Sequence, residues 1–242
     1  MDNHAKTAAI ILAAGKGTRM QSRTLKQYLA LENKPVLFYS LDTFSKLDII
    51  DEIVLVVSKG EREYCKAEIV DKYKIKKVRV ITEGGAERYL SVQNGLKQVS
   101  EDVEYVMVHD SARPLITADT INRAYRALVD KGACVVGVPV KDTIKQTDDN
   151  ARVAKTLPRN TLWTAQTPQC FKKEVLTRAY NNMYESMEAA EKSGKTLVIT
   201  DDAMIVEEYG GVNVWMVKGE YTNIKITTPE DIELAKLYMK FV

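Results

Sequence analysis

Short apolar runs alternate with amphipathic helical stretches along most of this chain, and this alternation restricts the fold more than any other feature. Each apolar run is too short for a surface helix and suits a strand buried on both faces. Strands joined by crossover helices pair in parallel, so the alternation predicts an α/β fold with a doubly wound, mostly parallel sheet. The predicted strands are 8–12, 53–57, 78–82, 105–108, 133–140 and 212–217, and the main predicted helices are 35–46, 60–73, 90–99, 117–131 and 172–192.

Two glycines and several cations follow the first predicted strand. Gly15 and Gly17 let the backbone approach a ligand and turn successive N–H groups toward it, which suits a chain of phosphates. A dinucleotide fingerprint needs a third glycine where Met20 stands, and the spacing of a Walker loop is absent as well. A strand-to-helix turn without a ligand explains the glycines equally well. The cations Arg19 and Lys26 shift the balance toward a phosphate-binding loop.

Three of the predicted strands end in residues suited to a ligand site. Glycines follow the first strand at 15 and 17 and the third at 84 and 85, and Asp110 and Arg113 follow the fourth. In doubly wound sheets ligands bind beyond the carboxyl ends of the strands, so these residues are expected around one crevice. Asp110 has an alternative explanation as a turn or capping residue. His109 is better explained as a hydrogen-bonded histidine near the core than as a ligand.

Composition limits the classes of function. The 242 residues suffice for one large α/β domain, and we expect a single domain over residues 1–242. The 35 basic and 33 acidic side chains leave a net charge of +2, too balanced to predict binding to nucleic acid or to a membrane. The three cysteines lie far apart without a C-x-x-C pattern, and with two histidines they give no basis for a zinc site.

Nothing in the sequence predicts export or insertion into a membrane. The polar N-terminus has no signal-peptide pattern, and no apolar run is long enough to span a bilayer. The cysteines are typical of reduced thiols, so we expect a cytoplasmic protein. The chain ends at Val242 after one domain, and we therefore expect no fused second enzyme.

A stretch at about 141–162 interrupts the alternation of strands and helices. Its flanks, 143–146 and 152–156, are β-like and enclose the polar turn 147–150, which predicts a hairpin. A hairpin projecting from a compact core leaves exposed edges, so we expect it to be the dimerisation arm of a homodimer. The segment 162–169 is expected to be a polar and aromatic loop.

The predicted site combines glycines, cations and a carboxylate, without a serine or cysteine nucleophile paired with a histidine. This set of groups favours a transfer reaction that depends on neutralising charge. Phosphoryl or nucleotidyl transfer fits, because its barrier falls mainly through positioning and electrostatic stabilisation of phosphate oxygens. An attacking group that is itself a phosphate needs no general base.

Seven segments make the chain resemble the 2-C-methyl-D-erythritol 4-phosphate cytidylyltransferases of the non-mevalonate isoprenoid pathway. Any one of them could match by chance, but seven in order at the family's spacing make a specific match over nearly the whole chain. The segments are AAGKGTRM with KQY (13–20 and 26–28), GGAERYLSVQNGL (84–96), HDSARP (109–114), PVKDTIK (139–145), PRNTLWTAQTPQCF (158–171), TDDA (200–203) and NIKITTPED (223–231). The resemblance implies a Rossmann-like nucleotidyltransferase fold with a protruding β-arm.

The resemblance also implies a reaction, in which CMP passes from CTP to 2-C-methyl-D-erythritol 4-phosphate and pyrophosphate leaves, with Mg²⁺ as cofactor. Arg19 and Lys26 are then expected to stabilise charge on the triphosphate, and Lys225 to hold the α-phosphate. The implied CTP-binding residues are Ala13, Ala14, Gly15, Gly17, Gly85, Ala86, Ser91, Asp110 and Ser111, with Asp110 also as the implied metal ligand. The residues implied for the methylerythritol phosphate are Arg113, Thr143, Arg159, Thr167 and Thr200. In this family the arm crosses to the neighbouring subunit, so Thr143 and Arg159 are expected to serve the partner's site.

Two positions depart from the family pattern. Leu25 stands where a proline usually precedes the KQY lysine, which predicts a less rigid loop, and Ser111 stands where alanine is usual. Neither change removes a charge, so the implied activity is retained. Two alternatives stay open: a ribitol-5-phosphate cytidylyltransferase, and a nucleotide-binding regulatory module that has lost turnover.

Overall fold

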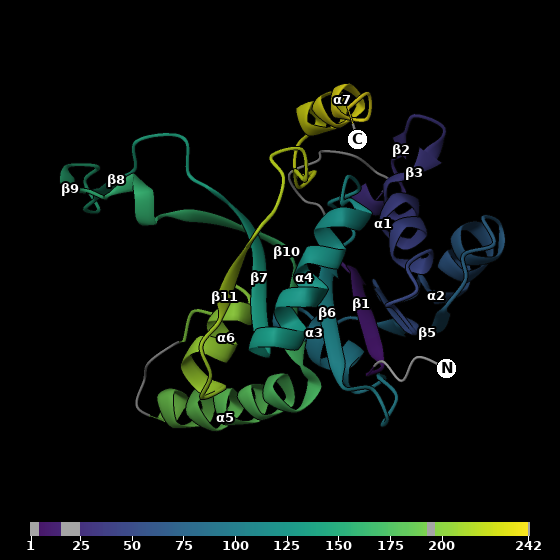
Figure 1. Cartoon of the computed structure of the whole chain (residues 1–242), viewed down its shortest axis with the longest axis horizontal. Helices are drawn as coiled ribbons and strands as arrows, with labels where there is room; N and C mark the ends of the chain where they lie inside the picture. The colour runs from purple at the N-terminus through teal and green to yellow at the C-terminus, as the bar shows by residue number, and fades with distance from the viewer. Residues whose placement is uncertain (1–4, 16–24, 193–196, 242) are drawn as a thin grey trace.

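A seven-stranded sheet forms the centre of the molecule, as a computed structural model of the chain shows (Figure 1). The structure describes residues 5–15, 25–192 and 197–241. The strand order is β11-β7-β10-β6-β1-β4-β5, and every neighbouring pair is parallel except the two that involve β10. The strands are β1 (Thr7–Ala13), β4 (Glu52–Val57), β5 (Val78–Glu83), β6 (Tyr105–Asp110), β7 (Ala133–Pro139), β10 (Trp163–Lys172) and β11 (Trp215–Lys218). The predicted α/β fold with a mostly parallel sheet is confirmed.

Helices cover both faces of the sheet because its strands bury side chains on both sides. Along β1, Ala9 and Ile11 belong to one hydrophobic cluster, while Ala8 and Ile10 belong to a second cluster on the other face. Residues of α1 (Val36–Ser45) and α4 (Ala118–Lys131) complete the first cluster. Residues of α3 (Arg88–Leu96), α5 (Lys173–Lys192) and α6 (Asp202–Tyr209) complete the second, so the sheet is doubly wound.

Local signals set the ends of α4. Thr117 caps its N-terminus, because the Thr117 hydroxyl accepts the Thr120 N–H at 3.2 Å. Gly132 ends the helix with a φ of 81°, a left-handed conformation that glycine adopts at little cost. The helix stop predicted at Gly132 is confirmed.

Two element boundaries differ from the prediction. The charged helix expected over 60–73 is a short α2 (Arg62–Cys65) followed by the π-helix η3 (Lys66–Asp71), whose buried residue Ile69 belongs to the first cluster. The strand expected over 212–217 begins three residues later, because β11 pairs with β7 only from Trp215 onward.

The segment 162–169, expected to be a loop, is instead part of β10, and that expectation was wrong. The strand runs antiparallel to both neighbours because the chain returns from the arm directly, without a crossover helix. Trp163 pairs with Pro139, so β7 and β10 form the two sides of one long hairpin. Polar residues and Pro168 hide the strand pattern, and the pairing shifts register between Ala165 and Gln169.

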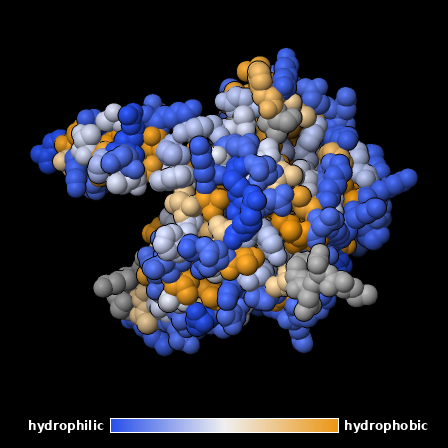
Figure 2. All heavy atoms as spheres, viewed as in Figure 1, coloured by the Kyte–Doolittle hydropathy of each residue, from blue (hydrophilic) through white to orange (hydrophobic). Residues whose placement is uncertain are grey.

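The tip of this long hairpin is the predicted arm, and it stands out from the rest of the molecule (Figure 1). Its strands β8 (Lys145–Thr147) and β9 (Val153–Thr156) pair antiparallel, which confirms the predicted hairpin. All seven residues of these two strands are exposed. Figure 2 shows that hydrophilic residues cover most of the visible surface of the arm.

The C-terminal region packs against residues within 29–39. The helix α7 (Pro229–Tyr238) shares a small third cluster with residues next to the short pair β2 (Ala30–Leu31) and β3 (Lys34–Pro35). The preceding segment lies outside the sheet, but the Ile226 N–H donates to the Ala112 carbonyl at 2.8 Å. This bond brings Lys225 next to the end of β6. Within the described part of the chain, no helix is both long and apolar enough to cross a membrane.

Candidate active site

A cavity of about 310 Å³ opens at the carboxyl edge of the parallel strands, where β1 and β6 end. Its walls come from the loop after β1, the loop between β5 and α3, the end of β6 and the segment before α7. The predicted site residues that line it are Ala13, Ala14, Gly15, Lys26, Gly85, Ala86, Ser91, Asp110, Ser111 and Lys225. One residue from each of the three predicted strand ends, Gly15, Gly85 and Asp110, therefore lines the same cavity, whereas Gly84 and Arg113 do not line it.

The loop between β5 and α3 is packed too tightly for any residue but glycine at two positions. A Cβ on Gly84 would lie 2.5 Å from the Cβ of Ala14, and one on Gly85 would lie 2.3 Å from the Cβ of Leu90. The Ser91 hydroxyl accepts the Gly85 N–H at 3.1 Å and ties the loop to the first turns of α3. Small residues thus form this wall of the cavity and leave room for a ligand beside it.

Asp110, the last residue of β6, is a buried carboxylate held between two cations. Lys225 Nζ lies 2.6 Å from Asp110 Oδ2, and Arg88 Nε donates to Asp110 Oδ1 at 3.2 Å. Burial alone would raise the pKa of Asp110, but the charges of Arg88 and Lys225 outweigh burial and hold that pKa well below its usual value. The carboxylate is therefore ionised at neutral pH.

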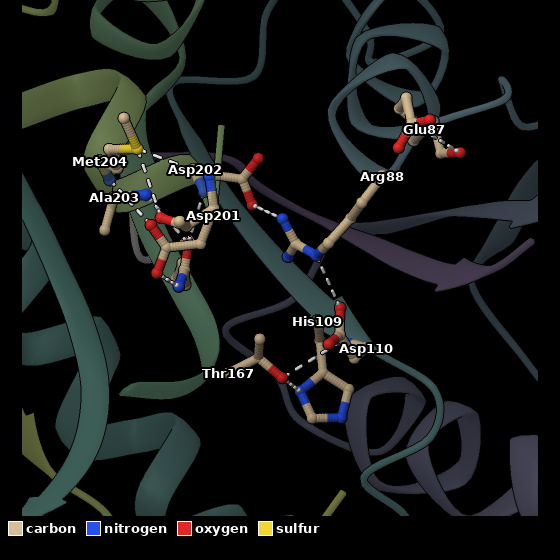
Figure 3. Close-up of polar contacts among 12 residues, drawn as sticks. Glu87, Arg88, His109, Asp110, Thr167, Asp201, Asp202, Ala203 and Met204 are labelled. Atoms are coloured by element: carbon tan, nitrogen blue, oxygen red, sulfur yellow. Dashed lines mark hydrogen bonds and ion pairs between the residues drawn. The ribbon is translucent and has the colours of Figure 1, made fainter. Parts of the chain in front are cut away.

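His109 supports the backbone around Asp110 from the core side (Figure 3). Its Nε2–H donates to the Arg113 carbonyl at 3.2 Å, so Nδ1 is the acceptor for the Thr167 hydroxyl at 2.9 Å. The same hydroxyl oxygen accepts the Asp110 N–H at 3.2 Å. Burial lowers the pKa of His109 to about 4, which keeps the imidazole neutral. His109 is the hydrogen-bonded core histidine that the sequence predicted.

Thr167 and Arg113, both expected to hold the acceptor phosphate, lie beside the cavity and already have protein partners. Thr167 is 3% exposed, and both roles of its hydroxyl are taken by His109 and Asp110. Arg113 Nη1 donates to the Asn223 carbonyl at 2.7 Å, while its buried Nε has no hydrogen-bond partner in the described part of the chain. Burial lowers the pKa of Arg113. Contact of these two residues with an acceptor stays a prediction.

The remaining predicted residues lie away from the cavity or outside the described residues. Thr200 is exposed just before α6, where its hydroxyl lies 3.3 Å from Met204 Sδ. Thr143 and Arg159 belong to the arm, and Arg159 Nη1 donates to the Lys141 carbonyl at 2.7 Å. Gly17 and Arg19 fall in 16–24, outside the described residues.

Several residues of the site escaped the sequence analysis. Gln27 is buried, lines the cavity, and donates from Nε2 to the Ala13 carbonyl at 2.7 Å. Arg88 joins Asp110 to the fully buried Asp202 across the cavity wall (Figure 3). The only sequence signal for Arg88 and Asp202 was that they lie in the segments GGAER and TDDA. Asp201 caps the N-terminus of α6, because its Oδ1 accepts the Met204 N–H at 2.9 Å.

The residues present fit a Mg²⁺ ion that arrives with a triphosphate. Mg²⁺ in enzymes of nucleotides usually keeps several waters and takes one or two carboxylates together with phosphate oxygens. Asp110 supplies such a carboxylate in the cavity wall. No group of three or more His, Cys, Asp or Glu side chains within the described ranges forms a metal site by itself.

A mostly parallel α/β sheet whose carboxyl edge carries a cavity lined by glycines, Asp110 and two lysines is the arrangement expected of a nucleotidyltransferase. The family model described as IspD, 2-C-methyl-D-erythritol 4-phosphate cytidylyltransferase, matches residues 7–241. The chain belongs to this family.

Curated relatives and a solved structure agree with this assignment. The 2-C-methyl-D-erythritol 4-phosphate cytidylyltransferase of Alkaliphilus oremlandii is 46% identical over 240 residues, which cover 99% of this chain and 98% of the relative. The protein of the same name from Alkaliphilus metalliredigens is 47% identical over 231 residues, covering 96% and 92%. The crystal structure of 4-diphosphocytidyl-2C-methyl-D-erythritol synthase from Anaerococcus prevotii is 33% identical, with a TM-score of 0.81 and coverage of 98% and 99%.

Proposed function

We propose that this enzyme transfers CMP from CTP to 2-C-methyl-D-erythritol 4-phosphate and releases pyrophosphate, in isoprenoid precursor biosynthesis. The observation that carries the proposal is the cavity that brings Lys26, Asp110 and Lys225 together in a member of this family. An oxygen of the acceptor phosphate attacks the α-phosphorus of CTP in line. The new P–O bond forms as the bond from the α-phosphorus to the bridging oxygen of pyrophosphate breaks.

The side chains of the cavity act by positioning and by neutralising charge. Lys26 and Lys225 both line the cavity, which supports a role in neutralising the charge that builds up when one anion attacks another. Arg19 is proposed as a third cation. The glycine loops 13–15 and 84–86 present backbone to the nucleotide, and Ser91 orders the second of these loops.

Asp110 is the residue that would hold Mg²⁺, because it is the ionised carboxylate that ends β6 in the cavity wall. The ion would neutralise phosphate charge and orient the triphosphate. Ser111, the next residue, is buried, and its N–H donates to the Leu12 carbonyl at 2.9 Å, which fixes the backbone beside Asp110.

We also propose that two copies of the chain form a homodimer in the cytoplasm and that each arm completes the partner's site. Thr143 and Arg159 lie on a projecting hairpin and away from the cavity of their own chain, which supports a role in another subunit. Light scattering after size exclusion at micromolar protein tests the dimer, and a monomeric mass contradicts it.

A turnover assay tests the proposed reaction. The purified protein is offered CTP and Mg²⁺ with either 2-C-methyl-D-erythritol 4-phosphate or ribitol 5-phosphate, and pyrophosphate release is measured. Faster release with methylerythritol phosphate is expected, in line with the names of the relatives. Preference for ribitol 5-phosphate would support the rival acceptor, and no release with either phosphate would support a regulatory module.

A further inference from the structure

Two cations share the Asp110 carboxylate, and they differ in how firmly they are held. Lys225 makes a single ion pair among the described residues, to Asp110 Oδ2, and its side chain is 36% exposed. Arg88 contacts Asp110 Oδ1 through Nε and Asp202 Oδ2 through Nη1, at 3.2 and 2.7 Å. The planar guanidinium therefore bridges two carboxylates, while the lysine ammonium on its flexible stem contacts one.

Asp202 gives Arg88 a rigid anchor. Its side chain is 0% exposed, and its Oδ1 accepts the hydroxyl of Tyr180, a buried residue of α5, at 2.7 Å. Its backbone N–H donates to Gln169 Oε1 at 3.0 Å, which fixes the first residue of α6 against β10. Arg88 thus connects the wall of the cavity to elements that lie behind it (Figure 3).

This difference matters once the nucleotide arrives, because an α-phosphate held by Lys225 competes with Asp110 for the lysine ammonium. Arg88 is the protein cation that stays with the buried carboxylate when Lys225 turns to the phosphate, so it keeps Asp110 oriented toward the Mg²⁺ ion that Asp110 would hold. Arg88 cannot follow the lysine, since its other end is fixed by Asp202.

We propose that Arg88 is a positioning residue, anchored by Asp202 and Tyr180, that holds Asp110 in place while Lys225 moves from Asp110 to the nucleotide. The inference rests on the proposed function, because it assumes that a nucleotide phosphate draws Lys225 away. It also explains why Arg88, the first residue of α3, spans the distance between β6 and α6.

Steady-state kinetics of Arg88→Gln and Arg88→Lys test the proposal. Arg88→Gln is expected to raise the KM for CTP about tenfold and lower kcat about tenfold, with the KM for the acceptor changed less than about twofold. Arg88→Lys is expected to recover part of the loss, because it restores the charge but cannot bridge both carboxylates. Arg88→Gln leaves the buried Asp202 unpaired, so Arg88→Gln/Asp202→Asn is measured as well and should show the same kinetic split.

Two tyrosines of α5 provide a matched pair of conservative variants. Tyr180→Phe removes the hydroxyl that holds Asp202, whereas Tyr184→Phe removes a buried hydroxyl with no hydrogen-bond partner among the described residues. Tyr180→Phe is expected to raise the KM for CTP about threefold in the natural protein and to have no further kinetic effect in Arg88→Gln. Tyr184→Phe is expected to leave the kinetics unchanged.

Several outcomes overturn the proposal. One is an Arg88→Gln variant whose kcat and KM values equal those of the natural protein. Another is an equal rise in the KM for CTP and the KM for the acceptor. The third is an effect of Tyr180→Phe that persists in the Arg88→Gln background. If the natural protein releases no pyrophosphate with either polyol phosphate, the proposed function fails separately. In that case the Kd for CTP with Mg²⁺, measured by calorimetry, tests whether Arg88 positions Asp110. An unchanged Kd in Arg88→Gln/Asp202→Asn contradicts this positioning role.

Discussion

Lys26 and Lys225 reach the cavity from opposite ends of the chain. Lys26 begins the 3-10 turn η2 (Lys26–Tyr28), and its Nζ lies 3.5 Å from the Ile226 carbonyl, next to Lys225. The buried Gln27 that follows holds the Ala13 carbonyl and so fixes the loop that carries Lys26. Two ammonium groups therefore line the same cavity. Substituting each lysine separately therefore tests its part in catalysis.

Lys26→Ala and Lys225→Ala are each expected to lower kcat about 100-fold or more, because each removes a charge that stabilises the transition state. The melting temperature should change little in Lys26→Ala, since Lys26 belongs to no hydrophobic cluster, and should fall in Lys225→Ala, which removes one of the two cations that hold the buried Asp110. Pyrophosphate release and thermal unfolding are measured in parallel. Lys76→Ala, at an exposed lysine far from the cavity wall, is the control. If either site variant had a kcat close to that of the natural protein, the substituted lysine would have no catalytic role.

At the scale of elements, buried polar side chains at strand ends bond the sheet to neighbouring segments. Glu52 begins β4, is buried, and accepts Arg79 Nε at 2.7 Å and the Ser100 N–H at 2.9 Å. The carboxylate thereby ties β4 to β5 and to the loop after α3, the helix that carries Arg88. Burial would raise the pKa of Glu52, but the bonds from Ser100 and Arg79 lower it overall.

The lowered pKa of Glu52 predicts a specific dependence of stability on pH. Its contribution is complete above the unfolded value of 4.5 and is lost as pH falls through the lower folded value. Glu52→Gln is expected to cost about 1–3 kcal/mol at pH 7 and less in acid. Urea unfolding of both proteins from pH 7 to pH 3 measures this difference. A difference that stays constant with pH would show that the charge of Glu52 contributes nothing.

At the scale of the whole molecule, the cavity and the arm lie on different parts of one chain. The arm is joined to the sheet through β7 and β10, where the Val140 N–H donates to the Leu162 carbonyl at 3.0 Å. The hydrophobic clusters contain no residue of β8 or β9. The arm is therefore not required for the core, and its expected role is in assembly and in the neighbouring site.

Mixing two inactive variants tests whether the arm serves the partner. Arg159→Ala lacks the arm cation, and Lys225→Ala lacks a cation of the cavity. If each site takes its arm from the partner, a mixed dimer regains one complete site, and random exchange restores about a quarter of natural activity. Pyrophosphate release is measured after unfolding and refolding the mixture. Activity no greater than the sum of the separate variants would contradict a shared site.

Local patterns in the sequence were sufficient for most of the fold and for half of the site. Apolar runs bounded by turn residues identify strands because the interior of a parallel sheet is apolar over the whole strand. Gly85 and Asp110 could be predicted because close backbone approach and strand-end position are visible in sequence. The strand β10 could not, because its polar residues and Pro168 carry a pairing that depends on the neighbours β6 and β7.

The α/β class, the projecting hairpin and the family follow from local periodicity and motifs, which can be read in the sequence. The ion pairs of the site depend instead on tertiary packing. Asp202 is the first residue of α6, yet it is fully buried and holds Arg88. Ion pairs and hydrogen bonds of buried groups depend on distances between elements far apart in the chain, and those distances exist only once the core has packed.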